Sequence, residues 1–236
     1  DIYYPVQEAK PVLHICKAKF PNESNLSLGI TKAMQLDNTE AESRVIKSKA
    51  YPDMKIDVAV NRSLIDFYNT YPSAYTNNDK MTYFRVYADT PMNEDVKKQI
   101  YPARRSCLQG LSEHQAVSRL LNFVQTGFEY EYDETIWGCD RAFFAEETLY
   151  YPYCDCEDRS ILLTRLIRDL LGLDCVLIYY PGHLACAVNF TQKEKGDYYM
   201  YNQKEYTVCD PTYINAPIGK QMPNFKDKEA TVVPIK

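Results

Sequence analysis

Three residues stand where their side chains can carry out nucleophilic chemistry. Cys156 opens a strongly apolar helical pattern, His183 follows a Pro-Gly turn at the start of a strand pattern, and Asp210 ends a later strand pattern. Equal intervals separate the three residues along the chain. Each interval leaves room for one or two secondary-structure elements, so a helix packed end-on against a sheet can bring all three together.

These residue types suit acyl transfer through a thiolate. The first turn of a helix offers free N–H groups and a positive dipole, so we expect a lowered pKa for the Cys156 thiol. His183 can take the thiol proton and return it to the leaving group. A carboxylate such as Asp210 on the other ring nitrogen fixes the tautomer and the ring orientation. The set predicts a Cys-His-Asp triad.

Three short motifs, in this order and spacing, resemble the transglutaminase-like superfamily over about residues 110–215. The resemblance implies a papain-like core, with Cys156 as nucleophile, His183 as base and Asp210 as the orienting acid. It also implies a peptide or carboxamide substrate and a reaction that requires no cofactor. The motifs are Asp155-Cys156-Glu157-Asp158-Arg159-Ser160, Gly182-His183 and Asp210-Pro211-Thr212.

The chain departs from the family pattern at two positions. Cys154 stands where the family usually has glycine, and Ala185 stands where an aromatic residue often follows the histidine. For the oxyanion, the backbone N–H of Cys156 is one candidate donor, since helix N-termini stabilise developing negative charge. The second donor is either the indole N–H of Trp137, the single tryptophan, or a polar group near Tyr153.

The predicted reaction begins with attack of Cys156 on a peptide or carboxamide carbonyl, and water or an amine then resolves the thioester. Protease, amidase and transglutaminase activities all follow this scheme. The alternative is a catalytically silent binding or scaffold module on the same fold, because a fold does not fix a function. In that case Cys156 is a packed structural thiol, His183 forms a hydrogen bond at the end of a strand, and Asp210 starts a turn.

The remaining cysteines leave two further alternatives open. Cys154 and Cys156 can bind zinc together with Cys139, Cys209 or His183, although no Cys-X₂-Cys pair is present and we predict no metal site. Cys154 can also pair with Cys139 in a disulfide, or resolve an oxidised Cys156.

The positions of the three residues depend on the elements that follow residue 105. Apolar residues at helical spacing predict a helix over 156–171. Strands are expected over 175–180, 183–190 and 206–209, with a further strand possible at 231–233. Strands that follow one another without helices between them predict an α+β fold with an antiparallel sheet, on which the nucleophile helix packs.

The first part of the chain matches nothing in the family pattern. We expect residues 1–100 to form an N-terminal extension of mixed strands and helices, and residues 101–236 to form the catalytic domain. Within the extension, the largely aromatic segment 83–87 predicts a strand. Residues 93–100 predict a helix that stops before Pro102, because proline disfavours helix interiors.

Composition excludes several classes of function. The 236 residues carry a net charge of −5 without a long basic run, so no nucleic-acid partner is expected. No apolar stretch approaches the ~18 residues of a membrane span. The sequence opens at Asp1 without methionine, which indicates a processed or trimmed chain and favours a secreted or periplasmic location. The expected partner is a peptide or protein substrate, and the oligomeric state stays open.

Overall fold

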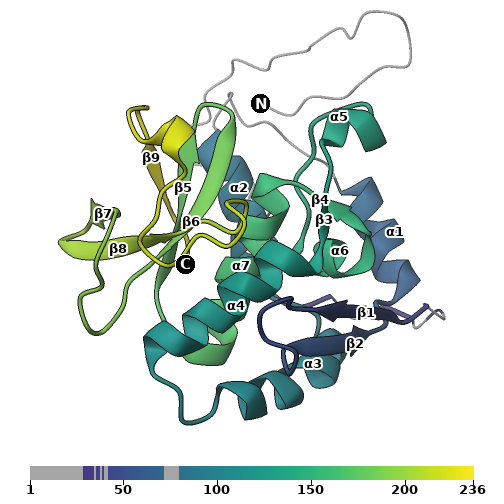
Figure 1. Ribbon diagram of the computed structural model, residues 1–236. Helices are drawn as coiled ribbons and strands as arrows, with labels where there is room; N and C mark the ends of the chain where they lie inside the picture. Colours follow the sequence, from purple (N-terminus) through teal and green to yellow (C-terminus); the bar gives the residue numbers. More distant parts are fainter. Residues whose placement is uncertain (1–28, 35, 38, 40–41, 72–79) are drawn as a thin grey trace, which may run out of the picture.

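The computed structural model describes residues 29–34, 36–37, 39, 42–71 and 80–236. Helices pack against a five-stranded antiparallel sheet with the strand order β7-β8-β6-β5-β9, which confirms the predicted α+β class (Figure 1). The strands of this sheet are β5 (Cys175–Tyr180), β6 (His183–Val188), β7 (Tyr198–Tyr201), β8 (Lys204–Cys209) and β9 (Thr231–Pro234).

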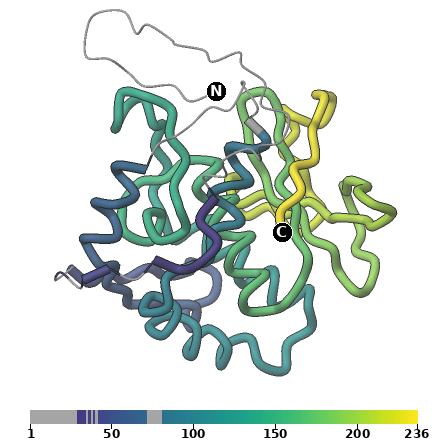
Figure 2. Tube along the Cα trace, turned by 180° about the vertical axis from the view of Figure 1, so that it is seen from behind, coloured from purple at the N-terminus to yellow at the C-terminus, as the bar shows by residue number. Residues whose placement is uncertain are grey.

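Helix α7 (Cys156–Leu171) forms the centre of the structure. Of the apolar stripe that the sequence predicts to be buried, Leu163, Leu166 and Ile167 are buried, whereas Leu170 and Leu171 are half-buried. Gly172 ends the helix at a φ of 69°, a left-handed conformation that favours glycine. The sheet lies on one side of α7, and most of the other helices and a small hairpin lie on the other, whereas the 3₁₀ helix near the C-terminus lies on the sheet side (Figures 1 and 2).

Strand register sets the positions of the two residues expected beside the nucleophile. Strands β5 and β6 form a hairpin closed by the Tyr180–His183 pair, and Gly182 adopts a φ of 85° in the turn between them. On the other side of β6, Cys186 pairs with Cys209 of β8. His183 therefore begins one strand and Asp210 directly follows its neighbour. The expected strand near 231–233 is also confirmed, because β9 pairs with β5.

Helices make up most of the remaining structure. Helix α4 begins at a capping box in which Ser112 and Gln115 satisfy each other's backbone N–H groups, as the sequence predicts. The other helices are α1 (Arg62–Thr70), α2 (Lys80–Asp89), α3 (Glu94–Leu108), α4 (Glu113–Gly127), α5 (Asp133–Ile136), α6 (Ala145–Tyr150) and the 3₁₀ helix η1 (Pro223–Phe225). Short strands form the pairs β1 (Arg44–Lys47) with β2 (Lys55–Val58) and β3 (Glu129–Tyr130) with β4 (Tyr153–Cys154).

Two expectations for the first half of the chain are wrong. Residues 83–87 belong to helix α2, where the buried rings of Tyr83, Phe84 and Tyr87 share one helical face. Spacings of i, i+1 and i+4 suit a helix, and the aromatic residue types had favoured a strand. Helix α3 continues through Pro102, because its buried face on both sides of the proline packs into the core.

The hydrophobic core joins the two parts expected from the sequence. One cluster of buried side chains extends from Ile46 in β1 to Val233 in β9. Helix α3 crosses the expected boundary at residue 100. Residues 1–28 of the expected N-terminal extension lie outside the described residues. In the part of the chain that the structure describes, no helix combines the length and apolar character that crossing a membrane requires.

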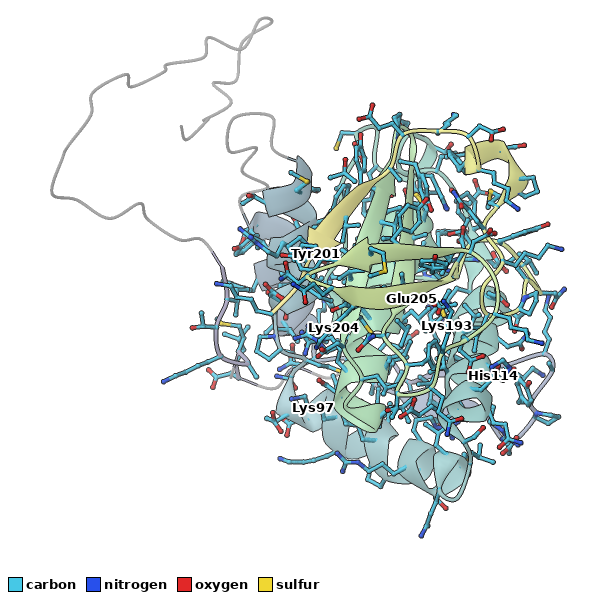
Figure 3. The ribbon with its side chains drawn as sticks, turned by 90° about the vertical axis from the view of Figure 1, so that its left-hand side faces the viewer. Lys97, His114, Lys193, Tyr201, Lys204 and Glu205 are labelled. Atoms are coloured by element: carbon cyan, nitrogen blue, oxygen red, sulfur yellow. The ribbon has the colours of Figure 1, made fainter. Side chains whose placement is uncertain are left out.

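The β7–β8 hairpin forms the outer edge of the sheet. Figure 3 looks onto this hairpin, with Tyr201 at the end of β7 and Lys204 and Glu205 at the start of β8. Lys193 pairs with Glu205 at 2.7 Å, and Lys204 pairs with Asp174 at 2.5 Å. These exposed pairs contribute little to stability, because solvent screens them.

Candidate functional site

The structure brings His183 and Asp210 together at one end of the sheet. Their closest atoms, Nε2 of His183 and Oδ2 of Asp210, lie 2.9 Å apart. His183 is 6% exposed and Asp210 is 2% exposed. A hydrogen bond between buried groups is stronger than one in water, so this contact fixes the ring orientation. When the imidazole is neutral, Nε2 carries the proton because a carboxylate only accepts.

Backbone groups of the following turn hold the Asp210 carboxylate. Its second oxygen, Oδ1, accepts hydrogen bonds from the N–H groups of Thr212 at 2.9 Å and Tyr213 at 3.2 Å. The buried amide of Gln125 donates to the Asp210 carbonyl at 3.1 Å and so ties this turn to helix α4. The carboxylate is thus oriented toward His183 by bonds that need no substrate.

Cys156 is the first residue of helix α7, as predicted. Asp155 caps the helix, since its side chain accepts from the N–H of Glu157 at 3.2 Å. In return, the Asp158 carboxylate accepts from the N–H of Asp155 at 3.2 Å. This reciprocal cap sets the direction in which the helix starts, and with it the position of the thiol.

The start of helix α7 adjoins the start of strand β6. Ser160 donates a hydrogen bond to the Leu184 carbonyl at 3.0 Å. The backbone N–H of Leu184 also interacts with the Cys156 sulfur. Leu184 is the residue next to His183, so the thiol lies near the backbone that carries the imidazole.

The Cys156 thiol, however, donates to the carboxylate of Glu157, with Sγ and Oε2 3.0 Å apart. Among the contacts of these described residues there is no hydrogen bond between Cys156 and His183. Cys156 is only 8% exposed. The structure therefore joins two members of the predicted triad directly, whereas the third lies near the backbone of β6 next to His183 and is bonded to another partner.

The pKa of the Cys156 thiol is raised well above its usual value, which corrects the expectation from the sequence. Burial is the main cause, and the carboxylates of Glu157 and Asp155 add to it by repelling a thiolate. The helix N-terminus acts in the opposite direction. Desolvation together with two adjacent acids outweighs a helix dipole, so the resting thiol is protonated.

Buried acids continue beyond the thiol. Burial raises the pKa of Asp133 to about 7, and burial also raises that of Asp158. Carboxylate oxygens of Asp133, Asp140 and Glu157 lie within 4.8 Å of one another. Oxygen ligands of this kind suit hard cations such as Ca²⁺ or Mg²⁺. Asp133 already accepts a hydrogen bond from the N–H of Arg141 at 2.7 Å.

Cys154 takes part in a buried polar network. Its sulfur accepts from the Nε of Arg159 at 3.4 Å, and the same guanidinium donates to the carbonyl groups of Gln125 at 3.3 Å and Phe128 at 3.0 Å. All cysteines in the described ranges are free thiols, so no disulfide joins Cys154 to the exposed Cys139. Arg159, four residues from the cap of α7, thus supports the backbone that precedes the nucleophile.

Trp137 ends helix α5 and packs in an aromatic cluster. Its ring contacts Tyr151 at 4.9 Å and Phe143 at 5.9 Å between centroids, and the Arg141 guanidinium lies 4.8 Å from it. These contacts give the indole a packing role, and its oxyanion role stays a prediction.

Tyr130 was not singled out from the sequence. Tyr130 of β3 pairs with Cys154 of β4, and Cys154 precedes the nucleophile position by two residues. Burial raises the pKa of its hydroxyl, and the charge of a Cys156 thiolate adds to the effect. One tyrosine among 21 carries no distinguishing sequence signal, since only the strand pairing places it here.

A cavity of about 730 Å³ lies elsewhere, between the β1–β2 hairpin and the segment that joins α6 to β4. Arg44, Arg62 and Tyr150 are among its lining residues, and none of the three predicted triad residues is. Arg44 donates to the carbonyl group of Pro152 at 3.3 Å, which ties the hairpin to this segment.

No protein-family model matches the chain, and none of the curated proteins is a significant match to it.

Proposed function

We propose that the protein catalyses thiol-dependent acyl transfer or hydrolysis on a peptide or carboxamide substrate, in the manner of a transglutaminase-like cysteine peptidase or amidase. Cys156 is the nucleophile, His183 the base and Asp210 the orienting acid. The observation that carries the proposal is the buried His183–Asp210 hydrogen bond beside the helix that begins at Cys156. The reaction requires no cofactor.

In the first half-reaction, Nδ1 of His183 accepts the Cys156 proton while Nε2 stays bonded to Asp210. The sulfur attacks the carbonyl carbon, and the backbone N–H of Cys156 stabilises the oxyanion, with Trp137 as the candidate second donor. His183 then protonates the departing amine or ammonia, which leaves a thioester. Water or a second amine, deprotonated by His183, attacks the thioester and releases the thiol.

The raised pKa of Cys156 selects one version of this scheme. A resting thiolate–imidazolium pair is disfavoured, because the buried acids next to the sulfur repel a negative charge. Proton transfer to His183 then accompanies attack on the substrate. The thiol must first leave Glu157, and rotation about the Cα–Cβ bond of Cys156 moves its sulfur without any backbone change.

One observation favours a second candidate function, a catalytically silent binding or scaffold module. In that reading the Cys156–Glu157 hydrogen bond is the permanent partner of the thiol, and the His183–Asp210 pair stabilises the sheet end. The two candidates differ in whether His183 controls the reactivity of Cys156.

A peptidyl vinyl sulfone, which alkylates thiols through an assisted attack, tests the difference. The wild type and the His183→Ala variant are treated at pH 7.5, and the modified cysteine is located by mass spectrometry. The proposed enzyme labels at Cys156, and labelling falls by about 10²-fold or more in the variant. The exposed Cys139 serves as the internal control, since its rate is the same in both proteins. Equal, slow labelling of Cys156 in both proteins would support the scaffold.

A further inference from the structure

Two aromatic rings lie against the imidazole of His183. The Phe225 ring is stacked on it, with centroids 4.6 Å apart and planes 19° apart. Tyr180 lies 5.9 Å from it, also at 19°. The Tyr180 and Phe225 rings are themselves 5.4 Å apart, so the three rings form a compact triangle. Both aromatic residues therefore cover one side of the imidazole and do not sandwich it.

The two rings reach His183 by different routes. Tyr180 faces His183 across the β5–β6 turn, so any hairpin of this register places it there. Phe225 comes from the single-turn helix η1, far along the chain, which is the yellow coil near the top of Figure 1. The position next but one to His183 is Ala185, which is too small to provide an aromatic wall. The tail of the chain provides that wall instead.

Specific contacts hold η1 in this place. The buried side-chain amide of Gln221 donates to the Phe225 carbonyl at 3.0 Å and to the Tyr199 hydroxyl at 3.2 Å. The backbone N–H of Gln221 donates to the Asp197 carboxylate at 3.1 Å, and Lys226 pairs with the same carboxylate at 3.5 Å. These bonds attach both ends of η1 to the β7–β8 edge of the sheet.

A close crossing of two backbones brings the tail to this edge. Gly196 and Gly219 adopt φ values of 119° and 78°, and a Cβ on Gly196 would lie 2.2 Å from the Gly219 carbonyl oxygen. The N–H of Asp197 donates to that oxygen at 2.7 Å, and the N–H of Gly219 donates to Val208 at 2.8 Å. Only glycine permits this approach, so the path that delivers Phe225 is built into the backbone.

We propose that Phe225 is a positioning residue for the base. Its ring restricts rotation of the His183 imidazole, so that Nε2 stays on Asp210 and Nδ1 stays available to the nucleophile. It also keeps water from the face of the His183–Asp210 hydrogen bond, which strengthens that bond. The catalytic consequence rests on the proposed function, whereas the effect on the imidazole does not.

The test measures the imidazole directly. Protein labelled with ¹⁵N-histidine contains three histidines, and the His183 signals are those lost in His183→Gln. In the wild type we expect the neutral imidazole to be a single tautomer with the proton on Nε2, the nitrogen that faces Asp210. Phe225→Ala should give averaged nitrogen signals of two tautomers, and Phe225→Tyr, which keeps the ring, should restore the wild-type signals. Phe67→Ala, a half-buried aromatic residue on α1, controls for general loss of packing.

The activity arm uses the same variants. Phe225→Ala should lower kcat by about 10- to 100-fold with KM within about twofold, because the base is misaligned while substrate contacts remain. If Phe225→Ala does not fold, Phe225→Leu replaces it, since leucine keeps apolar volume without a flat ring. Wild-type tautomer signals in the folded variant overturn the proposal. A wild type that is inactive on acyl substrates overturns the proposed function alone, because the tautomer measurement still decides the role of Phe225.

Discussion

The thiol of Cys156 donates its hydrogen bond to Glu157, the next residue of the same helix, at 3.0 Å. The thiol is thus hydrogen-bonded to a carboxylate, which disfavours a thiolate, and not to the imidazole that would favour one. Glu157 therefore has a direct influence on when Cys156 reacts.

Replacing Glu157 by glutamine should lower the pKa of Cys156. The amide keeps a hydrogen-bond acceptor for the thiol but removes the charge that repels a thiolate. The pH dependence of iodoacetamide modification at Cys156, followed by mass spectrometry, measures the effect. In the wild type we expect a midpoint above the usual range of a thiol, and in Glu157→Gln a lower midpoint. A wild-type midpoint near 6–7 would contradict the raised pKa and indicate a preformed ion pair with His183.

Two substitutions of Asp210 distinguish the roles of its two carboxylate oxygens. Asp210→Asn can still accept the N–H groups of Thr212 and Tyr213 through its amide oxygen, but it loses the charge that faces His183. We expect turnover to fall by about 10²- to 10⁴-fold while the melting temperature changes little. Asp210→Ala should lose turnover and also about 1–3 kcal/mol of stability, because it leaves the part-buried N–H groups of Thr212 and Tyr213 without an acceptor. Equal melting temperatures for the two variants would argue against the turn contacts.

Cys156 and Leu166 lie in the same helix and should respond differently to alanine. Cys156→Ala removes one sulfur atom at the helix start and should abolish turnover with a change in stability below about 1 kcal/mol. Leu166→Ala leaves a cavity in the fully packed face of α7 and should cost about 2–5 kcal/mol. Chemical denaturation measures both. The opposite ranking would assign Cys156 to the core.

Burial of Asp133 predicts a pH dependence of stability. Its pKa is raised to about 7 in the folded chain from 3.8 in its ordinary state, mainly by desolvation. The folded state therefore binds a proton that the unfolded state has lost, so this group lowers stability as pH rises from about 4 to 7. Asp133→Asn should remove about 1–2 kcal/mol of that decline, after allowance for solvent screening. Melting temperatures of the two proteins at pH 5 and 7.5 test this. An equal change in melting temperature between the two pH values in both proteins would refute it.

The predicted triad residues were accessible to sequence reasoning because each stands at the end of a regular element. The apolar stripe of α7, the Pro-Gly turn before His183 and the strand before Asp210 are local patterns, and the structure contains all three elements. Their arrangement follows from antiparallel pairing of β6 with its neighbour β8, which the absence of intervening helices predicts.

The remaining features depend on tertiary contacts that no local pattern encodes. The helix dipole alone predicts a lowered pKa for Cys156. The direction of the actual shift is set by burial and by the carboxylate of Glu157, which is hydrogen-bonded to the thiol. Phe225 lies in a tail that has no periodicity, and only the crossing of Gly196 and Gly219 brings it to His183. Aromatic residues such as Tyr83 favour a strand by their residue type. In the folded chain, packing of the buried Tyr83 ring against the core places it in helix α2 instead.

Strand β9 has a consequence for the order of folding. It pairs with β5, although β6, β7 and β8 all lie between these strands along the chain. One edge of β5 therefore has no strand partner until residues 231–234 have been synthesised. Pairing between strands so far apart in the sequence is slow. Phe225 lies in the segment that joins β8 to β9. We expect a nascent chain to join His183 to Asp210 early and to acquire the ring that covers His183 only in its last folding step.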